Sequence, residues 1–167
     1  MGHHRPRAPA PAHKIIARRE LTGQDRNVPK AVVVQDLTRV TFDHSGLVSV
    51  TYTTDGIIVA VRDDDPRTRW RYKFSSIQAV RITTSDCFDY TGVLIDNKLS
   101  RRLVEILGSS WLKALAAELR EHDASATFMD KSRHFVLAFH EQVIEVAAWT
   151  VDAEPVQLRY AGGQWIE

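Results

Sequence analysis

The residues best suited to acid–base chemistry in this sequence are a histidine and a glutamate near its C-terminal end. Residues 134–149 alternate in the pattern of a β-hairpin, and we predict Glu141-Gln142 as its two-residue loop. In that register His140 and Glu145 are diagonal neighbours across the hairpin. A carboxylate beside an imidazole fixes its tautomer and raises its basicity, as a general base requires. His140 and Glu145 are therefore the candidate catalytic pair. The alternative is a surface pair flanking a turn, because the sequence identifies no nucleophile or third group.

Metal and cofactor chemistry is not expected. His134 and His140 fall on one face of a predicted strand, but six residues of strand place them roughly 20 Å apart, too far to share one ion. The single cysteine, Cys87, excludes an intramolecular disulfide and a cysteine-ligated zinc site. The chain also contains no glycine-rich phosphate loop, nucleophile elbow or calcium loop. We predict no cofactor and no metal.

Two groups of cations are candidates for contact with phosphate. Residues 1–30 carry seven Lys or Arg against two acids, a net charge of +5, which leaves −4 for the remainder because the whole chain is +1. A basic tail of this kind can bind nucleic acid or only solubilise the chain. The second group is a cationic stripe on one predicted strand, which can bind a lipid headgroup or nucleic acid, or can guard a sheet edge. Its members are Arg67, Arg69, Arg71 and Lys73.

The elements that must position these residues are mostly strands, because apolar residues recur with period two from residue 30 onward. We predict strands at 31–34, 37–42, 47–53, 57–62, 69–74 and 77–83, with turns at Asp55-Gly56 and Ser75-Ser76. Residues 93–95 and 103–107 are predicted to form a hairpin across Asp96-Asn97, and a helix over 100–107 is the alternative. A last strand is expected at 156–160.

One helix is predicted with a clear start signal. Serines follow Gly108, and serine is a preferred N-cap residue. The apolar side chains that come next fall at helical spacing: Trp111, Leu112, Leu115, Ala116 and Leu119. The predicted fold is therefore α+β: a mostly antiparallel sheet, curved or closed into a sandwich or partly open barrel, packed against one main helix near residues 110–121.

Length and composition set the organisation of the chain. A sequence of 167 residues with 44% hydrophobic residues is the size and composition of one globular domain. Residues 1–12 alternate proline with small residues, so we predict an extended tail there and a single domain over 13–167. We find no apolar run long enough to span a bilayer and no signal peptide, and we expect a soluble, cytoplasmic protein of unknown oligomeric state.

These observations lead to three functional hypotheses. The leading one is a non-enzymatic protein-interaction module of bacterial-type cytosolic character, such as an adaptor, immunity or assembly protein, with an unidentified protein partner. The first alternative is a small enzyme or ligand-binding barrel with a pocket between sheet and helix and with His140 and Glu145 as acid and base. Its pocket would be lined by aromatic residues such as Trp70, Tyr72 and Trp149. The second alternative is binding of a phosphate backbone by the basic tail and stripe. An enclosed cavity of at least ~300 Å³ that holds a histidine or carboxylate would favour the enzyme or ligand hypothesis, whereas a filled core and an exposed apolar patch would favour the interaction module.

Overall fold

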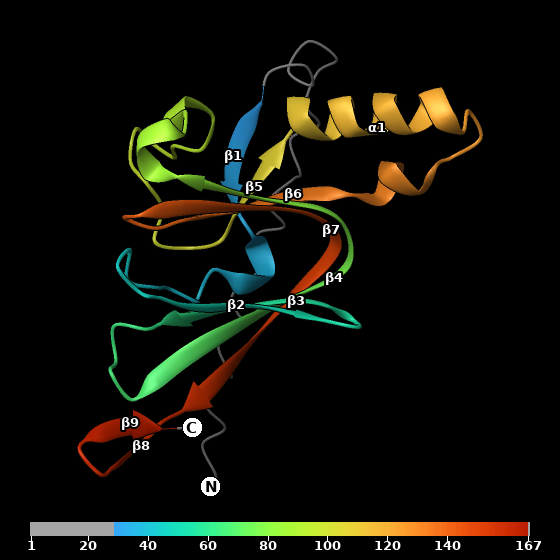
Figure 1. Cartoon of the computed structure of the whole chain (residues 1–167). Coiled ribbons are helices and arrows are strands. Elements are labelled where there is room, and N and C mark those ends of the chain that lie inside the picture. Colours follow the sequence, from blue (N-terminus) through green and yellow to red (C-terminus); the bar gives the residue numbers. More distant parts are fainter. Residues whose placement is uncertain (1–28, 167) are drawn as a thin grey trace, which may run out of the picture.

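The computed structural model describes residues 29–166 and shows an α+β fold built on a seven-stranded antiparallel sheet with one main helix. The sheet is not closed into a barrel (Figure 1). Its strand order is β1-β5-β6-β7-β4-β3-β2. The strands are β1 (Lys30–Val33), β2 (Leu47–Thr53), β3 (Gly56–Arg62), β4 (Thr68–Thr84), β5 (Val104–Leu107), β6 (Arg133–Ala138) and β7 (Gln142–Gln157).

The remaining elements are short, apart from the main helix. A separate two-stranded hairpin, β8 (Arg159–Ala161) and β9 (Gln164–Ile166), follows the sheet. The main helix is α1 (Ser110–His122), and the 3₁₀ turns are η2 (Gln35–Leu37), η3 (Ser85–Cys87), η4 (Tyr90–Gly92) and η5 (Phe128–Lys131). Among residues 29–166, no helix is both long and apolar enough to cross a membrane.

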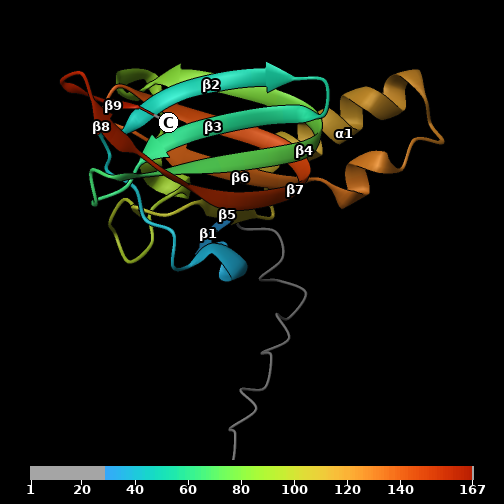
Figure 2. The same cartoon turned by 90° about the horizontal axis from the view of Figure 1, so that it is seen from below.

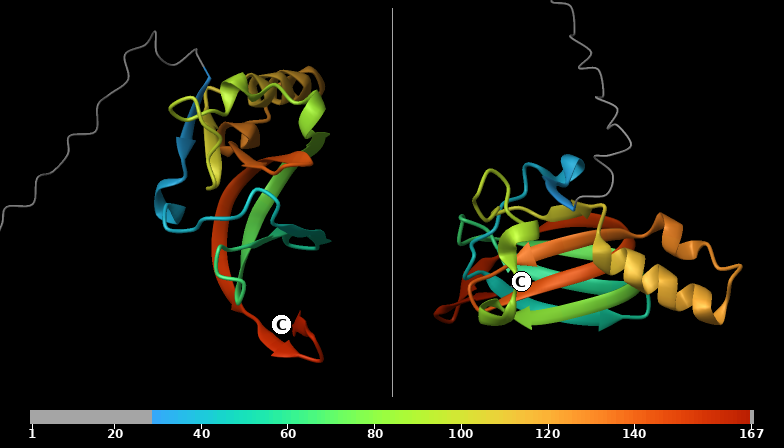
Figure 3. Two further views of the ribbon diagram at one scale, coloured as in Figure 1. Left: turned by 90° about the vertical axis from the view of Figure 1, so that its left-hand side faces the viewer. Right: turned by 90° about the horizontal axis from the view of Figure 1, so that it is seen from above.

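The two longest strands of the sheet extend from one end of the domain to the other. β4 and β7 pair from Thr68 with Gln157 to Thr84 with Gln142, and they curve through the domain (Figure 3). The prediction of two strands separated by a turn at Ser75-Ser76 was wrong. Ser76 has a positive φ of 53°, and the pairing register shifts between Ile77 and Ala79, so a bulge bends one continuous strand. β7 likewise runs through Pro155 instead of starting a new strand after it.

The main core lies where this bent sheet folds over on itself. Tyr72 and Phe74 of β4 are fully buried, as the predicted alternation along that strand requires. The Phe74 ring packs against Phe135 of β6, with ring centroids 5.6 Å apart. Residues 37–42 do not form the predicted strand, yet Val40 and Phe42 still enter this core from an irregular segment after η2.

A smaller core covers the other face of the β5, β6 and β7 region. Residues 85–99 lie over it and contribute Val93, which packs with β5, β6 and β7 residues. The predicted hairpin of 93–95 with 103–107 does not form. Asp96 and Asn97 do make a tight turn with positive φ, but it closes on Lys98, while β5 pairs with β1 and β6. Residues 104–107 are strand, so the helical alternative is wrong.

The β6–β7 hairpin has the predicted faces in a different register. Phe135 lies opposite Val146 and Ala138 opposite Val143, which makes His140-Glu141 the two-residue loop instead of Glu141-Gln142. This register differs from the predicted one by two residues. Because side chains alternate with period two, a shift of two keeps every residue on its predicted face but changes its cross-strand partner.

Helix α1 begins where the serine signal predicts. The Ser109 hydroxyl accepts a hydrogen bond from the Leu112 amide, as an N-cap does. The predicted apolar side chains are half-buried, whereas the intervening ones are exposed. The helix runs beyond the strands at one end of the domain (Figure 3), and its first turn meets the sheet through Trp111, whose ring lies 4.9 Å from that of His134.

Candidate functional site

A cluster of ionisable and polar side chains lies beneath the first turn of α1, with His134, Glu145 and Ser109 buried and Arg81 at its exposed side; we call it the polar array. Arg81 of β4 and Glu145 of β7 are direct cross-strand partners. His134 of β6 lies opposite Ala147, which makes it a diagonal neighbour of Glu145 on the same face. Three adjacent strands therefore bring three residues together that are up to 64 positions apart in sequence.

Arg81 and Glu145 form a bidentate ion pair. Arg81 Nε donates to Glu145 Oε2 at 2.5 Å, and the second guanidinium nitrogen donates to Oε1 at 2.6 Å. The Glu145 side chain is 3% exposed, whereas that of Arg81 is 49% exposed. Burial raises the pKa of the Glu145 carboxyl, but interactions with His134 and Arg81 outweigh burial, so its pKa is lowered overall. The hydrogen bonds to Glu145 also raise the pKa of Arg81.

His134 links this ion pair to the helix. Its Nδ1 lies 2.9 Å from the Ser109 hydroxyl, and its Nε2 lies 3.2 Å from Glu145 Oε1. The Ser109 oxygen already accepts the Leu112 amide, so its own proton is available to donate to Nδ1. In a neutral imidazole Nε2 then carries the ring proton and faces the carboxylate. That contact is electrostatic, because Nε2 makes no hydrogen bond of acceptable angle.

An aromatic ring closes the array from the helix side. The guanidinium carbon of Arg81 lies 4.8 Å from the centroid of the Trp111 ring, within cation–π distance. The same ring meets His134 edge-on. Trp111 therefore contacts both Arg81 and His134 and covers the helix side of the array.

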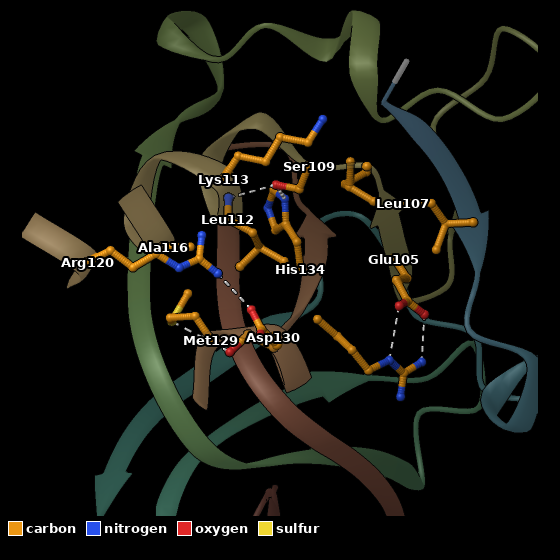
Figure 4. A pocket seen from close by; sticks show the side chains of 14 residues that line it. Glu105, Leu107, Ser109, Leu112, Lys113, Ala116, Arg120, Met129, Asp130 and His134 are labelled. Carbon is orange, nitrogen blue, oxygen red and sulfur yellow. Dashed lines mark hydrogen bonds and ion pairs between the residues drawn. The ribbon is translucent and has the colours of Figure 1, made fainter. Parts of the chain in front are cut away.

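Two cavities meet at Ser109 and His134. One, of about 530 Å³, is also lined by Arg81, Trp111 and Glu145. The other, of about 420 Å³, lies on the far side of the helix start (Figure 4), where two ion pairs line its wall. These pairs join Arg133 with Glu105 and Arg120 with Asp130. The first cavity has a volume typical of a ligand site and is lined by a histidine and a carboxylate, but it opens to solvent instead of being enclosed.

Most polar groups of the array nevertheless have a hydrogen-bond partner within it; among the described residues, the exception is His134 Nε2. Both oxygens of Glu145 are bound by Arg81, and an ionised carboxylate with a lowered pKa is a weak base. The Ser109 oxygen serves as a helix cap, and Ser109 is only 5% exposed. The geometry therefore supports a structural role, in which these side chains join α1 to the sheet. The sequence of contacts, from hydroxyl to imidazole to carboxylate, is also the one that a catalytic relay requires.

The predicted catalytic pair is not brought together. His140 lies in the hairpin loop, where its amide donates to the His44 carbonyl at 2.8 Å and its ring lies 6.4 Å from the His44 ring. The imidazole beside Glu145 belongs to His134. The sequence pattern correctly put His134 and Glu145 on one face of the hairpin. It did not predict their contact, because the predicted register differs from the observed one by two residues. It had no signal for Arg81, because the pairing of β4 with β7 is non-local.

The cationic stripe lies beside acidic residues. β4 is an interior strand between β3 and β7, so the stripe does not guard a sheet edge. Arg67 pairs with Asp65 at 3.1 Å, and Arg71 lies 3.9 Å from Glu154. The two other members of the stripe, Arg69 and Lys73, lie opposite Val156 and Asp152 of β7.

Trp149 is held away from the stripe. Its indole N–H donates to the Phe128 carbonyl of η5 at 3.1 Å, and the Lys131 ammonium lies 5.1 Å from its ring centroid. It therefore packs with η5 and does not line a pocket with Tyr72, which is in the core. The basic tail lies outside the described residues.

The two edges of the sheet differ in how they are protected. β1 begins with Lys30 and follows Pro29, two residues that discourage further pairing. β2 has the sequence Leu-Val-Ser-Val-Thr-Tyr-Thr, with no charge and no proline. Its one irregularity is a bulge at Val48, which leaves a regular stretch, Ser49–Thr53, that we call the open edge. Figure 2 shows β2 on the outside of β3.

Among residues 29–166, no three His, Cys, Asp or Glu side chains are arranged to hold a metal ion. No protein-family model, no curated protein and no solved structure matches this chain. The assignment of function therefore rests on the geometry of the polar array and the open edge.

Proposed function

We propose that this protein is a non-enzymatic protein-interaction module of the adaptor, immunity or assembly kind, and that it binds its partner by strand addition at the open edge. The observation that carries the proposal is that the open edge, Ser49–Thr53 of β2, has no charge, proline or bulge and pairs with no described strand on its outer side. Natural sheets block their edges with charges, prolines or covering segments, because an exposed strand presents unpaired N–H and C=O groups. In β2, alternate residues direct these groups away from β3. An extended partner segment satisfies them by main-chain hydrogen bonds.

The polar array supports this proposal because its contacts are those of a structural cluster and not of a catalytic site. Its ion pair and hydrogen bonds are made within the protein, so it holds the fold together and leaves few groups free for a substrate. The open edge, in contrast, pairs with no described strand on its outer side, and Tyr52 within it is 66% exposed.

A site-specific photo-crosslinker tests the proposal in the full-length chain. Placed at Tyr52 and activated in the native host, it is expected to give one discrete protein adduct. The same crosslinker at Tyr160, which is as exposed but lies in β8, is the control and should not give that adduct. Thr51→Lys, which puts a charge on the open edge, should reduce its yield. No discrete adduct from Tyr52, or the same adduct from both positions, would contradict the proposal.

A second candidate function is acyl transfer or ester hydrolysis at Ser109. The observation in its favour is the order of contacts: Ser109 to His134 at 2.9 Å, and His134 to Glu145 at 3.2 Å. In such a reaction the Ser109 oxygen bonds to the substrate carbonyl carbon while its proton passes to His134 Nδ1. The leaving group takes that proton, and water then releases the acyl group.

An activated ester separates this candidate from the first. Hydrolysis of p-nitrophenyl acetate and labelling by a fluorophosphonate probe are expected to require Ser109 and His134 if the array is catalytic. Ser110→Ala is the matched control, since Ser110 lines the same cavity without contacting His134. Equal turnover and labelling in wild type, Ser109→Ala and Ser110→Ala would eliminate the catalytic candidate.

A further inference from the structure

The sequence of the open edge is complementary to itself in an antiparallel arrangement. It reads Ser-Val-Thr-Tyr-Thr over residues 49–53, with Thr51 at its centre. If two copies pair about a two-fold axis at Thr51, Ser49 lies opposite Thr53 of the second copy, and Val50 opposite Tyr52 of the second copy. Thr51 then faces itself across the axis.

Each of these cross-strand pairs is of a favourable type. Hydroxyl side chains opposite one another exchange hydrogen bonds, and an aromatic residue opposite a β-branched one packs well, with each pair contributing about 0.2–1 kcal/mol. The open edge carries no charge, so self-pairing brings no like charges together. The apolar side chains of the two paired strands also fall on the same face of the sheet. Val50 and Tyr52 pair with Val59 and Ile57 of β3, which point into the main core, so the new contacts extend that apolar face.

We propose that the partner at the open edge is a second copy of this chain, joined by antiparallel β2–β2 pairing into one continuous sheet. This inference rests on the proposed function, because it names the occupant of the same edge. Pairing of a single short strand belongs to the small class of interfaces. The dimer is therefore expected to dissociate on dilution.

The two-fold axis at Thr51 allows a charge-exchange experiment. Sedimentation velocity of the full chain over a concentration series is expected to show a monomer–dimer equilibrium. Thr51→Lys and Thr51→Glu each place like charges opposite one another, and each should weaken dimerisation by roughly fivefold. An equimolar mixture of the two variants should restore it, because the mixed dimer pairs opposite charges. Thr150→Lys, at an exposed threonine of the interior strand β7, is the control and should dimerise as wild type.

The outcomes separate this inference from the proposed function. A wild-type chain that stays monomeric at every concentration, or a mixture that dimerises no better than its components, overturns self-pairing. The mass of the adduct formed by the crosslinker at Tyr52 is then measured. An adduct of twice the chain mass supports the second copy, and an adduct of another mass leaves a protein partner at the open edge but refutes the second copy. Circular dichroism of each variant confirms that a lost dimer is not a lost fold.

Discussion

Replacing Arg81 with methionine tests whether the buried carboxylate of Glu145 depends on its guanidinium partner. Removing one member of a fully buried ion pair costs about 3–5 kcal/mol, because a buried charge is left uncompensated. Here solvent screens part of the interaction, since the Arg81 side chain is 49% exposed. His134 also remains 3.2 Å from the carboxylate after the substitution. We therefore expect the free energy of unfolding to fall by about 2 kcal/mol at pH 7.

The loss should depend on pH with a definite sign. The pKa of Glu145 in the folded protein lies below its ordinary value of 4.5. Its contribution to stability is therefore present above the unfolded-state pKa and is lost as pH falls through the lower folded-state pKa. Without Arg81, fewer interactions offset the burial of the Glu145 carboxylate, so the pKa of Glu145 in the folded protein rises. Protonation then relieves the buried charge, so the difference between wild type and variant should shrink from pH 7 to pH 4.

Urea unfolding at the two pH values measures this difference. Arg67→Met is the matched control, because Arg67 makes an ion pair with Asp65 that is exposed to solvent and therefore contributes little to stability. Combining Arg81→Met with Glu145→Gln should cost less than the sum of the single changes, since the double variant buries no unpaired charge. A loss at pH 7 no larger than that of the control, or an equal loss at both pH values, would refute the reasoning.

Three further predictions concern folding stability and use chemical denaturation at pH 7. Ser109→Ala removes the helix cap and the partner of His134, and should cost about 2 kcal/mol, whereas Ser110→Ala should cost much less; equal costs would contradict the capping role. Gly56→Ala should be strongly destabilising because its Cβ would collide with a backbone carbonyl of β4, while Gly92→Ala, with open space around it, should be tolerated; a stable Gly56→Ala chain would show that the β3–β4 approach is looser than described. Tyr72→Phe should raise stability by about 1 kcal/mol, because the buried Tyr72 hydroxyl has no hydrogen-bond partner among residues 29–166 and burial, with a nearby aspartate, raises its pKa; a loss of stability would reveal a partner for that hydroxyl.

The local features of this fold could be predicted from the sequence. Period-two alternation identified most of the strands and showed which side chains of β4 and of the β6–β7 hairpin point inward. Helical spacing and serine capping chemistry located α1 to within one or two residues. These signals are readable because they depend on neighbours in the chain, where backbone geometry fixes the direction of each side chain.

The candidate site depended on information that local patterns do not carry. A two-residue change in hairpin register leaves every face unchanged, so alternation alone could not choose between His140 and His134 as the partner of Glu145. Arg81 joins them only because β4 pairs with β7 along its whole length, a contact between segments distant in sequence. The status of β2 as an open edge follows from the strand order of the complete sheet. Tertiary structure decided these points because the total packing and hydrogen bonding of the sheet set register and strand order, and no single segment contains that information.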